Sequence, residues 1–249
     1  MMPLRPAWLS SRPIAHRGLH DNGSARPENS LAAFDAAAEA GYPCELDVQL
    51  THTGTLVALH DYDLERATGV ARPVATLTAA DLASTRLFGS DQHVPTLPEV
   101  LDCVDGRIPL QIELKRPRQS APRALARAVL ETLESHRGKR GQYALSSFDP
   151  PTVYALRAAR PGLPIGQISG LLRTSGPVTR LIGRSMAANY LTHPDFISYE
   201  LAALPSRIVA MWRRRGVIVL AWTVESPDDE IRARKHADNI IFSGFLPDI

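Results

Sequence analysis

The chain has 249 residues, of which 44% are hydrophobic and 22% are charged, as in ordinary soluble globular proteins. This length is enough for one large domain, and α/β barrels commonly reach it as a single unit. The formal net charge of +2 is too small to indicate nucleic acid as a partner.

Segments typical of strands and helices alternate along nearly the whole chain. The predicted strands, in chain order, are residues 12–16, 44–50, 56–60, 108–115, 143–147 and 165–169, a weak one within 189–199, and then 217–224 and 239–243. Helical segments lie between them, and one of these begins at a capping box formed by Thr96 and Glu99. The repeated strand–helix order predicts a parallel sheet covered by helices.

Two of the predicted strands, 44–50 and 56–60, are close enough in sequence to form a hairpin-like excursion. About eight strands then remain, which suits a (β/α)₈ TIM barrel of the α/β class. Residues 64–92 are the least regular segment, and we expect them to be a small insertion after the strand that ends at His60. No linker or repeat divides the chain, so we expect residues 1–249 to form a single domain.

Carboxylates occupy one face of two predicted strands. Alternation places Glu45 and Asp47 on one face of the second strand, and Glu113 and Lys115 on one face of the fourth. Because barrels of this kind carry their active sites at the C-terminal ends of the strands, we expect the three carboxylates to share the barrel mouth. Protonation, pairing with Lys115 and Arg17, or a divalent metal could relieve their repulsion. The alternative is an exposed edge strand with its polar face in water.

A metal held by these carboxylates would have oxygen ligands only. Such ligands favour the hard ions Mg²⁺, Ca²⁺ or Mn²⁺ over zinc. His16 and His60 each end a predicted strand beside the carboxylates. Either histidine alone could be a satisfied core residue, but both together indicate acid/base chemistry.

The segment PENS, residues 27–30, combines a loop proline with polar side chains. Asn29 and Ser30 are good helix caps, and we expect both to have that structural role. Glu28 is expected to contact Arg17 or the metal rather than the substrate. Asp61 follows His60 directly, and we expect it to support the site in the same indirect way.

Short motifs in a defined order make the chain resemble a known family. They are AHRG (15–18), PENS (27–30), ELDV (45–48), HD (60–61), PTL (95–97), IELK (112–115), SSFD (146–149) and WTV (222–224). In this order they resemble the glycerophosphodiester phosphodiesterase family, whose defining pattern of His-Arg, Glu-x-Asp and His-Asp is complete here. The resemblance runs from about residue 12 to the C-terminus, with little signature between roughly 170 and 210.

The resemblance implies a (β/α)₈ barrel with a divalent metal and an acid/base pair. The implied site comprises Glu45, Asp47 and Glu113 as metal ligands, His16 and His60 as acid/base groups, Arg17 and Lys115 as phosphate contacts, and Trp222 as a wall for the glycerol or alcohol group. It implies metal-dependent hydrolysis of a glycerophosphodiester to glycerol 3-phosphate, or a similar phosphomonoester, and an alcohol.

The sequence leaves three points open: which histidine is the acid, what the nucleophile is, and which of two alternative functions could apply. We take His16 as the base and His60 as the acid, although nothing in the sequence excludes the reverse, and the nucleophile is either water or a substrate hydroxyl. One alternative function is a lysophospholipase D-like reaction on lysophospholipids, which would need an apolar groove or a membrane-facing patch. The other is a non-catalytic phosphate-binding barrel, which loss of either histidine would have favoured.

The partner that the sequence predicts is a small-molecule phosphodiester, and the oligomeric state is not indicated. No stretch approaches the ~18 apolar residues of a transmembrane helix. The N-terminal residues lack the continuous apolar run of a signal peptide. We therefore expect a cytoplasmic protein without a stable membrane anchor.

Overall fold

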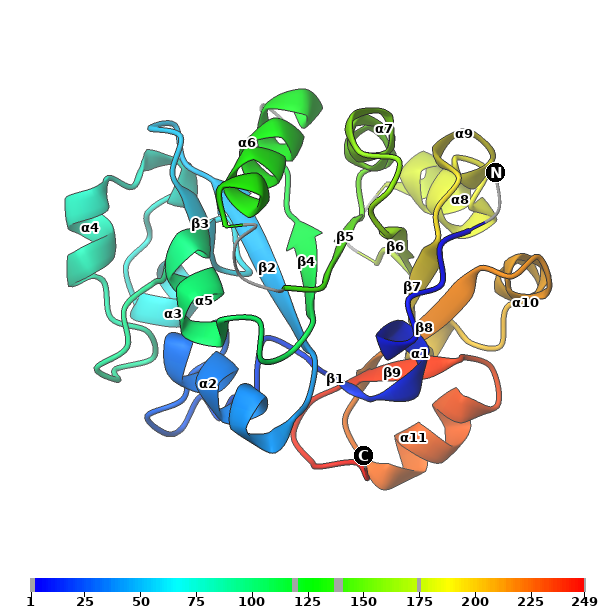
Figure 1. The fold of residues 1–249 in the computed structure, drawn as a ribbon, viewed down its shortest axis with the longest axis horizontal. Coiled ribbons are helices and arrows are strands. Elements are labelled where there is room, and N and C mark those ends of the chain that lie inside the picture. The colour runs from blue at the N-terminus through cyan, green and yellow to red at the C-terminus, as the bar shows by residue number, and fades with distance from the viewer. Residues whose placement is uncertain (1–2, 118–120, 137–140, 174–175, 249) are drawn as a thin grey trace. The chain divides into compact units, whose positions relative to one another are not determined.

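The computed structural model describes residues 3–117, 121–136, 141–173 and 176–248 (Figure 1). Its contacts divide the chain into two compact parts. The first part is Ala15–Tyr143, and the second part combines Met1–Ile14 with Ala144–Ile249.

The first part is built around strand β2. Its elements are β1 (Ile14–Ala15, shared with the second part), α2 (Leu31–Ala40), β2 (Cys44–Leu50), β3 (Leu56–Ala58), α3 (Glu65–Thr68), η1 (Val74–Thr76), α4 (Ala79–Ser84), α5 (Leu97–Val104), β4 (Leu110–Leu114) and α6 (Pro122–Ser135). Strand β2 pairs in parallel with β1 and β4 and antiparallel with β3. Its register places Asp47 opposite Glu113, so residues far apart in sequence become neighbours.

The second part repeats a strand–helix unit. Its elements are α1 (Trp8–Ser11), β5 (Tyr143–Ser147, which begins on the last residue of the first part), α7 (Pro150–Ala159), β6 (Ile165–Ser169), α8 (Pro177–Ser185), α9 (Asn189–Thr192), β7 (Phe196–Glu200), η2 (Leu201–Ala203), α10 (Arg207–Arg214), β8 (Ile218–Val224), α11 (Pro227–Arg234) and β9 (Asn239–Phe242). Strands β5 to β9 pair in parallel, each with the next along the chain.

The alternation of parallel strands and helices makes the fold a (β/α)₈ barrel, as the sequence predicts. Among the described residues, eight strands are parallel and β3 is the additional antiparallel strand. Among them, no helix combines the length and the apolar character that crossing a bilayer requires. That residues 1–249 act as one domain stays a prediction.

The insertion after β3 has a hydrophobic cluster of its own. It contains α3, η1 and α4, and Figure 1 shows α3 and α4 on its left-hand side, the side of β3. The buried members of the cluster are Val57, Leu59, Leu64, Ala67, Val74, Leu77, Leu82, Leu87 and Val94. Burial of these side chains fixes the short helices, which on their own would be too short to be stable.

Several strand boundaries differ from the predicted ones. Strand β1 covers only Ile14–Ala15, so His16 lies just beyond it. Strand β3 ends at Ala58, although the amide of Leu59 still donates to the carbonyl of Asp47 in β2. The weak strand predicted within 189–199 begins instead at Phe196, after helix α9.

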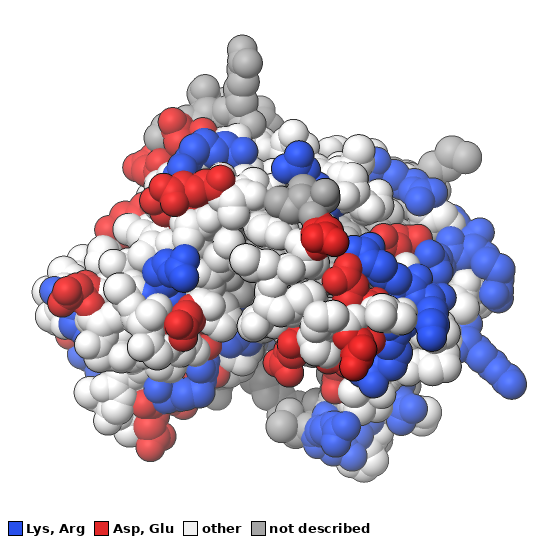
Figure 2. All heavy atoms as spheres, turned by 90° about the horizontal axis from the view of Figure 1, so that it is seen from below, with Lys and Arg blue, Asp and Glu red and all other residues white. Residues whose placement is uncertain are grey.

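A run of arginines ends helix α10. Arg213 and Arg214 lie in its last turn, where positive charge favours the helix dipole. Arg213 pairs with Asp238 at 2.9 Å, and Arg215 lies over the rings of Trp212 and Tyr190. Figure 2 shows basic side chains crowded along its right-hand edge, the side on which Figure 1 places α8 and α10.

Candidate active site

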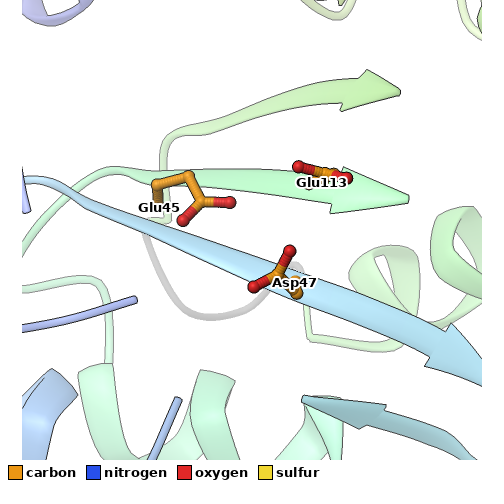
Figure 3. A group of neighbouring side chains, drawn as sticks. All are labelled: Glu45, Asp47 and Glu113. Carbon is orange, nitrogen blue, oxygen red and sulfur yellow. The ribbon is translucent and has the colours of Figure 1, made fainter. Parts of the chain in front are cut away.

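Three carboxylates from two strands of the first part face one another. Glu45 and Asp47 extend from β2 and Glu113 from β4 (Figure 3). One oxygen of each lies within 4.8 Å of the others. All three residues are buried, with 8% exposure at most, so the alternative of an exposed edge strand is wrong. The parallel register that places Asp47 opposite Glu113 brings the cluster together.

Asp47 is the best compensated of the three carboxylates. Arg17 Nε lies 3.2 Å from its Oδ2, and Lys115 Nζ lies 3.6 Å from its Oδ1. The side-chain amide of Asn29 donates to Oδ2 at 3.0 Å. Burial raises the pKa of Asp47, but the charges of Lys115 and Arg17 outweigh it and hold the pKa below its ordinary value. Asp47 is therefore a carboxylate at neutral pH.

Glu45 and Glu113 are less well compensated. Burial and the charges of Asp47 and Glu113 raise the pKa of Glu45 well above its ordinary value. Burial also raises the pKa of Glu113 to about 7, although Lys115 Nζ lies 3.5 Å from its Oε1. The buried cluster thus carries more negative charge than its neighbouring cations balance, and an added cation would stabilise both ionised forms.

His16 lies directly after β1 and beside the cluster. Its Nε2 is 3.9 Å from Oε2 of Glu45. Burial and the positive charge of Arg17 lower the pKa of His16 to about 3. The imidazole is therefore neutral at neutral pH and has a nitrogen lone pair that can accept a proton.

His60 is held by its neighbour Asp61 and by a side chain of β2. Its Nδ1 lies 2.7 Å from Oδ1 of Asp61. Gln49 donates through Nε2 to the carbonyl oxygens of Leu59 at 2.7 Å and of Asp61 at 2.6 Å, which fixes the turn that carries the histidine. Gln49 follows Asp47 by two residues and therefore lies on the same face of β2, but its contact with this turn could not be read from the sequence.

Glu28 links two arginines at the edge of the cluster. Arg17 Nη1 lies 2.7 Å from its Oε1, and Arg66 donates to both of its oxygens. Burial raises the pKa of Glu28, but hydrogen bonds from Arg66 and the charge of Arg17 lower it to about 2. The sequence proposed Glu28 as a contact of Arg17 or the metal, and the structure places it on Arg17. The sequence did not indicate Arg66, because only the fold brings the insertion close to Glu28.

The two residues expected to cap a helix differ in the structure. Ser30 caps α2, accepting a hydrogen bond from the amide of Ala33. Asn29 does not cap the helix, because its side chain turns to Asp47 and bonds both the carboxylate and the backbone amide of that residue. The expectation for Asn29 was therefore wrong.

Trp222 belongs to the second part of the chain, on β8. Its ring meets that of Phe148 edge to face, with the ring centroids 5.6 Å apart. The carboxylates, both histidines, Arg17 and Lys115 all belong to the first part. The role of Trp222 as a wall of the alcohol pocket stays a prediction.

Comparison with known proteins identifies the family. Residues 16–242 match the Glycerophosphoryl diester phosphodiesterase family. The chain belongs to this family. Because its members are phosphoric diester hydrolases, the chain is an enzyme of that class.

Relatives of the chain cover nearly its whole length. It is 29% identical over 230 residues to a glycerophosphodiester phosphodiesterase of Caldanaerobacter subterraneus subsp. tengcongensis, and the match covers 89% of each chain. The crystal structure of a glycerophosphodiester phosphodiesterase from Parabacteroides distasonis matches with a TM-score of 0.73 and 25% identity, over 93% of this chain and 92% of that one. One from Thermotoga maritima matches with a TM-score of 0.69 and 25% identity, over 92% of both chains.

Proposed function

We propose that the chain hydrolyses glycerophosphodiesters to glycerol 3-phosphate, or a similar phosphomonoester, and an alcohol. The observation that carries this proposal is the gathering of His16 and two cations around a buried carboxylate cluster in the first part, with His60 close enough to interact electrostatically with Asp47. A phosphodiester is an anion with a poor leaving group. Its hydrolysis needs positive charge at the phosphate and groups that accept and donate protons.

The carboxylate cluster fits a divalent cation. Glu45, Asp47 and Glu113 would hold it, and Mg²⁺, Ca²⁺ and Mn²⁺ suit a set of oxygen ligands. The raised pKa values of Glu45 and Glu113 indicate that the cluster lacks positive charge. When bound, the cation would polarise the phosphoryl oxygens and offset negative charge that develops in the transition state.

Arg17 and Lys115 are the side chains that would hold the phosphate. Arg17 contacts Glu28 through Nη1 and Asp47 through Nε. Among the described residues, Nη2 of Arg17 has no hydrogen-bond acceptor, so this nitrogen can donate to a phosphate oxygen. Lys115 Nζ lies between two carboxylates, at 3.5 and 3.6 Å, and adds a charge that a phosphate can share.

The two histidines suit different halves of the reaction. His16 is buried and neutral, which is the form that takes a proton from an attacking hydroxyl. Burial lowers the pKa of His60, but its Nδ1 bonds Asp61, and a carboxylate at this position stabilises the imidazolium that gives a proton to the leaving alcohol. We therefore assign His16 as the base and His60 as the acid.

The test is turnover of chelator-treated protein after Mg²⁺, Ca²⁺ or Mn²⁺ is restored. The substrates are glycerophosphocholine, glycerophosphoethanolamine and a lysophosphatidylcholine, and Glu113→Gln is compared with Glu131→Gln, an exposed glutamate paired with Arg127. We expect metal-restored release of alcohol from a glycerol diester, lost in Glu113→Gln alone. Turnover of only the lysophospholipid would change the substrate class, and no turnover of any diester would refute the proposal.

In the same proposal, residues 1–249 act as one domain in the cytoplasm. We expect a single cooperative unfolding transition in urea, with the same midpoint whether it is measured by fluorescence or by circular dichroism. Two separate transitions would contradict the single domain. Cell fractionation followed by immunodetection would test the compartment, and recovery of the chain in a membrane or extracellular fraction would contradict it.

A further inference from the structure

One arginine of the insertion bridges two carboxylates beside the candidate active site. Arg66, in α3, donates through Nε to Oδ2 of Asp61 at 2.5 Å. Its Nη1 and Nη2 donate to the two oxygens of Glu28 at 3.0 and 2.6 Å. All three nitrogens of one guanidinium are therefore engaged. A lysine, with a single nitrogen, could not reproduce this bridge.

Packing within the insertion holds α3, and with it Arg66, in place. Leu64, two residues before Arg66, and Ala67, directly after it, are buried in the hydrophobic cluster. Helix α3 ends at Thr68 and is capped by Gly69, which has a φ of 76° and donates its amide to the carbonyl of Glu65. The guanidinium carbon of Arg66 lies 5.4 Å from the centre of the Phe88 ring.

His60 needs such support because its side chain is partly open to solvent. The side chain is 34% exposed, and that of its partner Asp61 is 26% exposed. Gln49 fixes the backbone of the turn but does not bond the imidazole ring. Asp61 bonds the ring, and the contacts of its other oxygen decide how firmly the carboxylate is held. Arg66 makes that contact.

We propose that Arg66 is a positioning residue, which acts through Asp61 to hold the imidazole of His60 in the orientation that delivers a proton to the leaving alcohol. The inference rests on the proposed function, in which His60 is the acid. In this proposal the insertion contributes to the reaction, because Arg66, which bonds Asp61, belongs to α3.

The proton transfer that depends on this orientation accompanies cleavage of the diester. The phosphorus–oxygen bond to the alcohol breaks, and its electron pair stays on the alcohol oxygen. That oxygen takes the proton from Nε2 of His60, which becomes neutral while Nδ1–H remains bonded to Asp61. The attacking water, or a substrate hydroxyl, gives its proton to His16 and forms the new bond to phosphorus.

The experiment compares leaving groups of different basicity. Arg66→Met and Arg66→Lys are assayed, with the activating ion present, on glycerophosphocholine and on bis(p-nitrophenyl) phosphate. An aliphatic alcohol leaves only with a proton, whereas p-nitrophenolate leaves without one. We expect kcat for glycerophosphocholine to fall by about 10–100-fold in both variants. The kcat for the aryl diester should change by no more than about threefold. KM should change little for either substrate, because Arg17 keeps its contacts with Asp47 and Glu28.

The insertion supplies a matched control. Arg72 forms a forked pair with Asp81 at 2.6 and 2.8 Å, and it contacts none of the site residues. Arg72→Met should leave kcat for both substrates unchanged. In addition, Arg66→Met should have little further effect in an Asp61→Asn background, because both changes break the same chain of contacts.

A readout independent of turnover separates this inference from the proposed function. Long-range ¹H–¹⁵N NMR reports the tautomer of His60, and we expect Nδ1–H to dominate in the parent chain and to give way to a mixture in Arg66→Met. Equal losses on both diesters, additive effects with Asp61→Asn, rescue by Arg66→Lys or an unchanged tautomer would each overturn the role of Arg66. An inactive parent chain that shows the expected tautomer change would refute the function and support the positioning.

Discussion

Asn29 bonds Asp47 at two points. Its amide nitrogen donates to the carboxylate oxygen Oδ2 at 3.0 Å, and its carbonyl oxygen accepts the backbone amide of Asp47 at 3.3 Å. Both residues are buried, and Asn29 has a φ of 57°, in the left-handed region. The side chain of Asn29 therefore fixes the orientation of one carboxylate of the candidate metal site.

Replacing Asn29 with glycine should weaken metal binding. Glycine tolerates the positive φ, so Asn29→Gly removes the amide without adding backbone strain. We expect the dissociation constant of the activating ion to rise by about 10–100-fold, since the groups that orient metal ligands have effects of this size. Calorimetric titration measures it. Asn22→Gly, which removes an amide bonded to Glu28 instead, is the control, and an equal effect there would argue against the role of Asn29.

The stability of the metal-free chain should fall as pH rises from about 4.5 to 7. Glu113 has a pKa of about 7 when folded and about 4.5 when unfolded, so the folded chain binds more protons in this window. Stability then decreases with rising pH, by about 3 kcal/mol at most for this group. Urea unfolding of chelator-treated protein measures the slope. It should be shallower in Glu113→Gln and in protein loaded with metal, and a flat profile of the parent chain would contradict the prediction.

Glu28 should stabilise the fold at neutral pH but not in acid. Its pKa is about 2 in the folded chain, below the ordinary value, so the stabilisation is present above about pH 4.5 and is lost as pH falls toward 2. At pH 7 we expect Glu28→Gln to unfold with about 2 kcal/mol less free energy than the parent chain. The difference should shrink between pH 4.5 and 3. Urea unfolding at pH 7, 4 and 3 checks this, with Glu131→Gln as the exposed control.

His16→Ala and His60→Ala should each leave the fold intact and abolish turnover. Loss of an acid or base group lowers the rate by about 10²–10⁴-fold. His52→Ala is the matched control, because His52 is exposed and its ring bonds the carbonyl of Ala75 in η1, away from the site residues. Steady-state kinetics with thermal unfolding of each variant separates chemistry from folding. Near-normal activity of either site variant would remove that histidine from the mechanism.

Trp222→Ala should change substrate preference more than metal affinity. We expect the ratio of kcat/KM for glycerophosphocholine and glycerophosphoethanolamine to change, because an aromatic wall contacts the alcohol rather than the ion. Trp222→Phe keeps an aromatic ring beside Phe148 and should have a smaller effect. A variant that is defective only in metal titration would exclude the pocket role.

The carboxylate cluster could be predicted because strands have a period of two. Alternation alone placed Glu45 and Asp47 on one face, and the same rule applied to Glu113 on another strand. The barrel class followed from the order of strands and helices. These inferences use only neighbouring residues, which is why the sequence sufficed.

The contacts made by Asn29 and Arg66 could not be predicted in this way. Asn29 is 18 residues from Asp47, and Arg66 is 38 residues from Glu28. Local rules favoured a helix cap for Asn29, and the buried carboxylate offered it a stronger hydrogen bond. Nothing in the irregular segment 64–92 marked Arg66 among its other charged residues. Only the packing of the insertion determines which arginine reaches the site.

The way in which residues 8–14 are buried has a consequence for synthesis. Trp8, Leu9 and Ile14 pack with Phe196, Ile218, Leu220 and Ile241, and the side chain of Asn239 bonds the carbonyl of Leu9, 230 residues earlier. At about 5–20 residues per second, a ribosome adds the last of these partners roughly 10–50 seconds after the first. Phe196, the first large partner, is added roughly 10–40 seconds after Trp8, and until then Trp8, Leu9 and Ile14 lack every large partner from the later part of the chain. Until those partners are made, this nascent segment exposes apolar surface that a chaperone can bind.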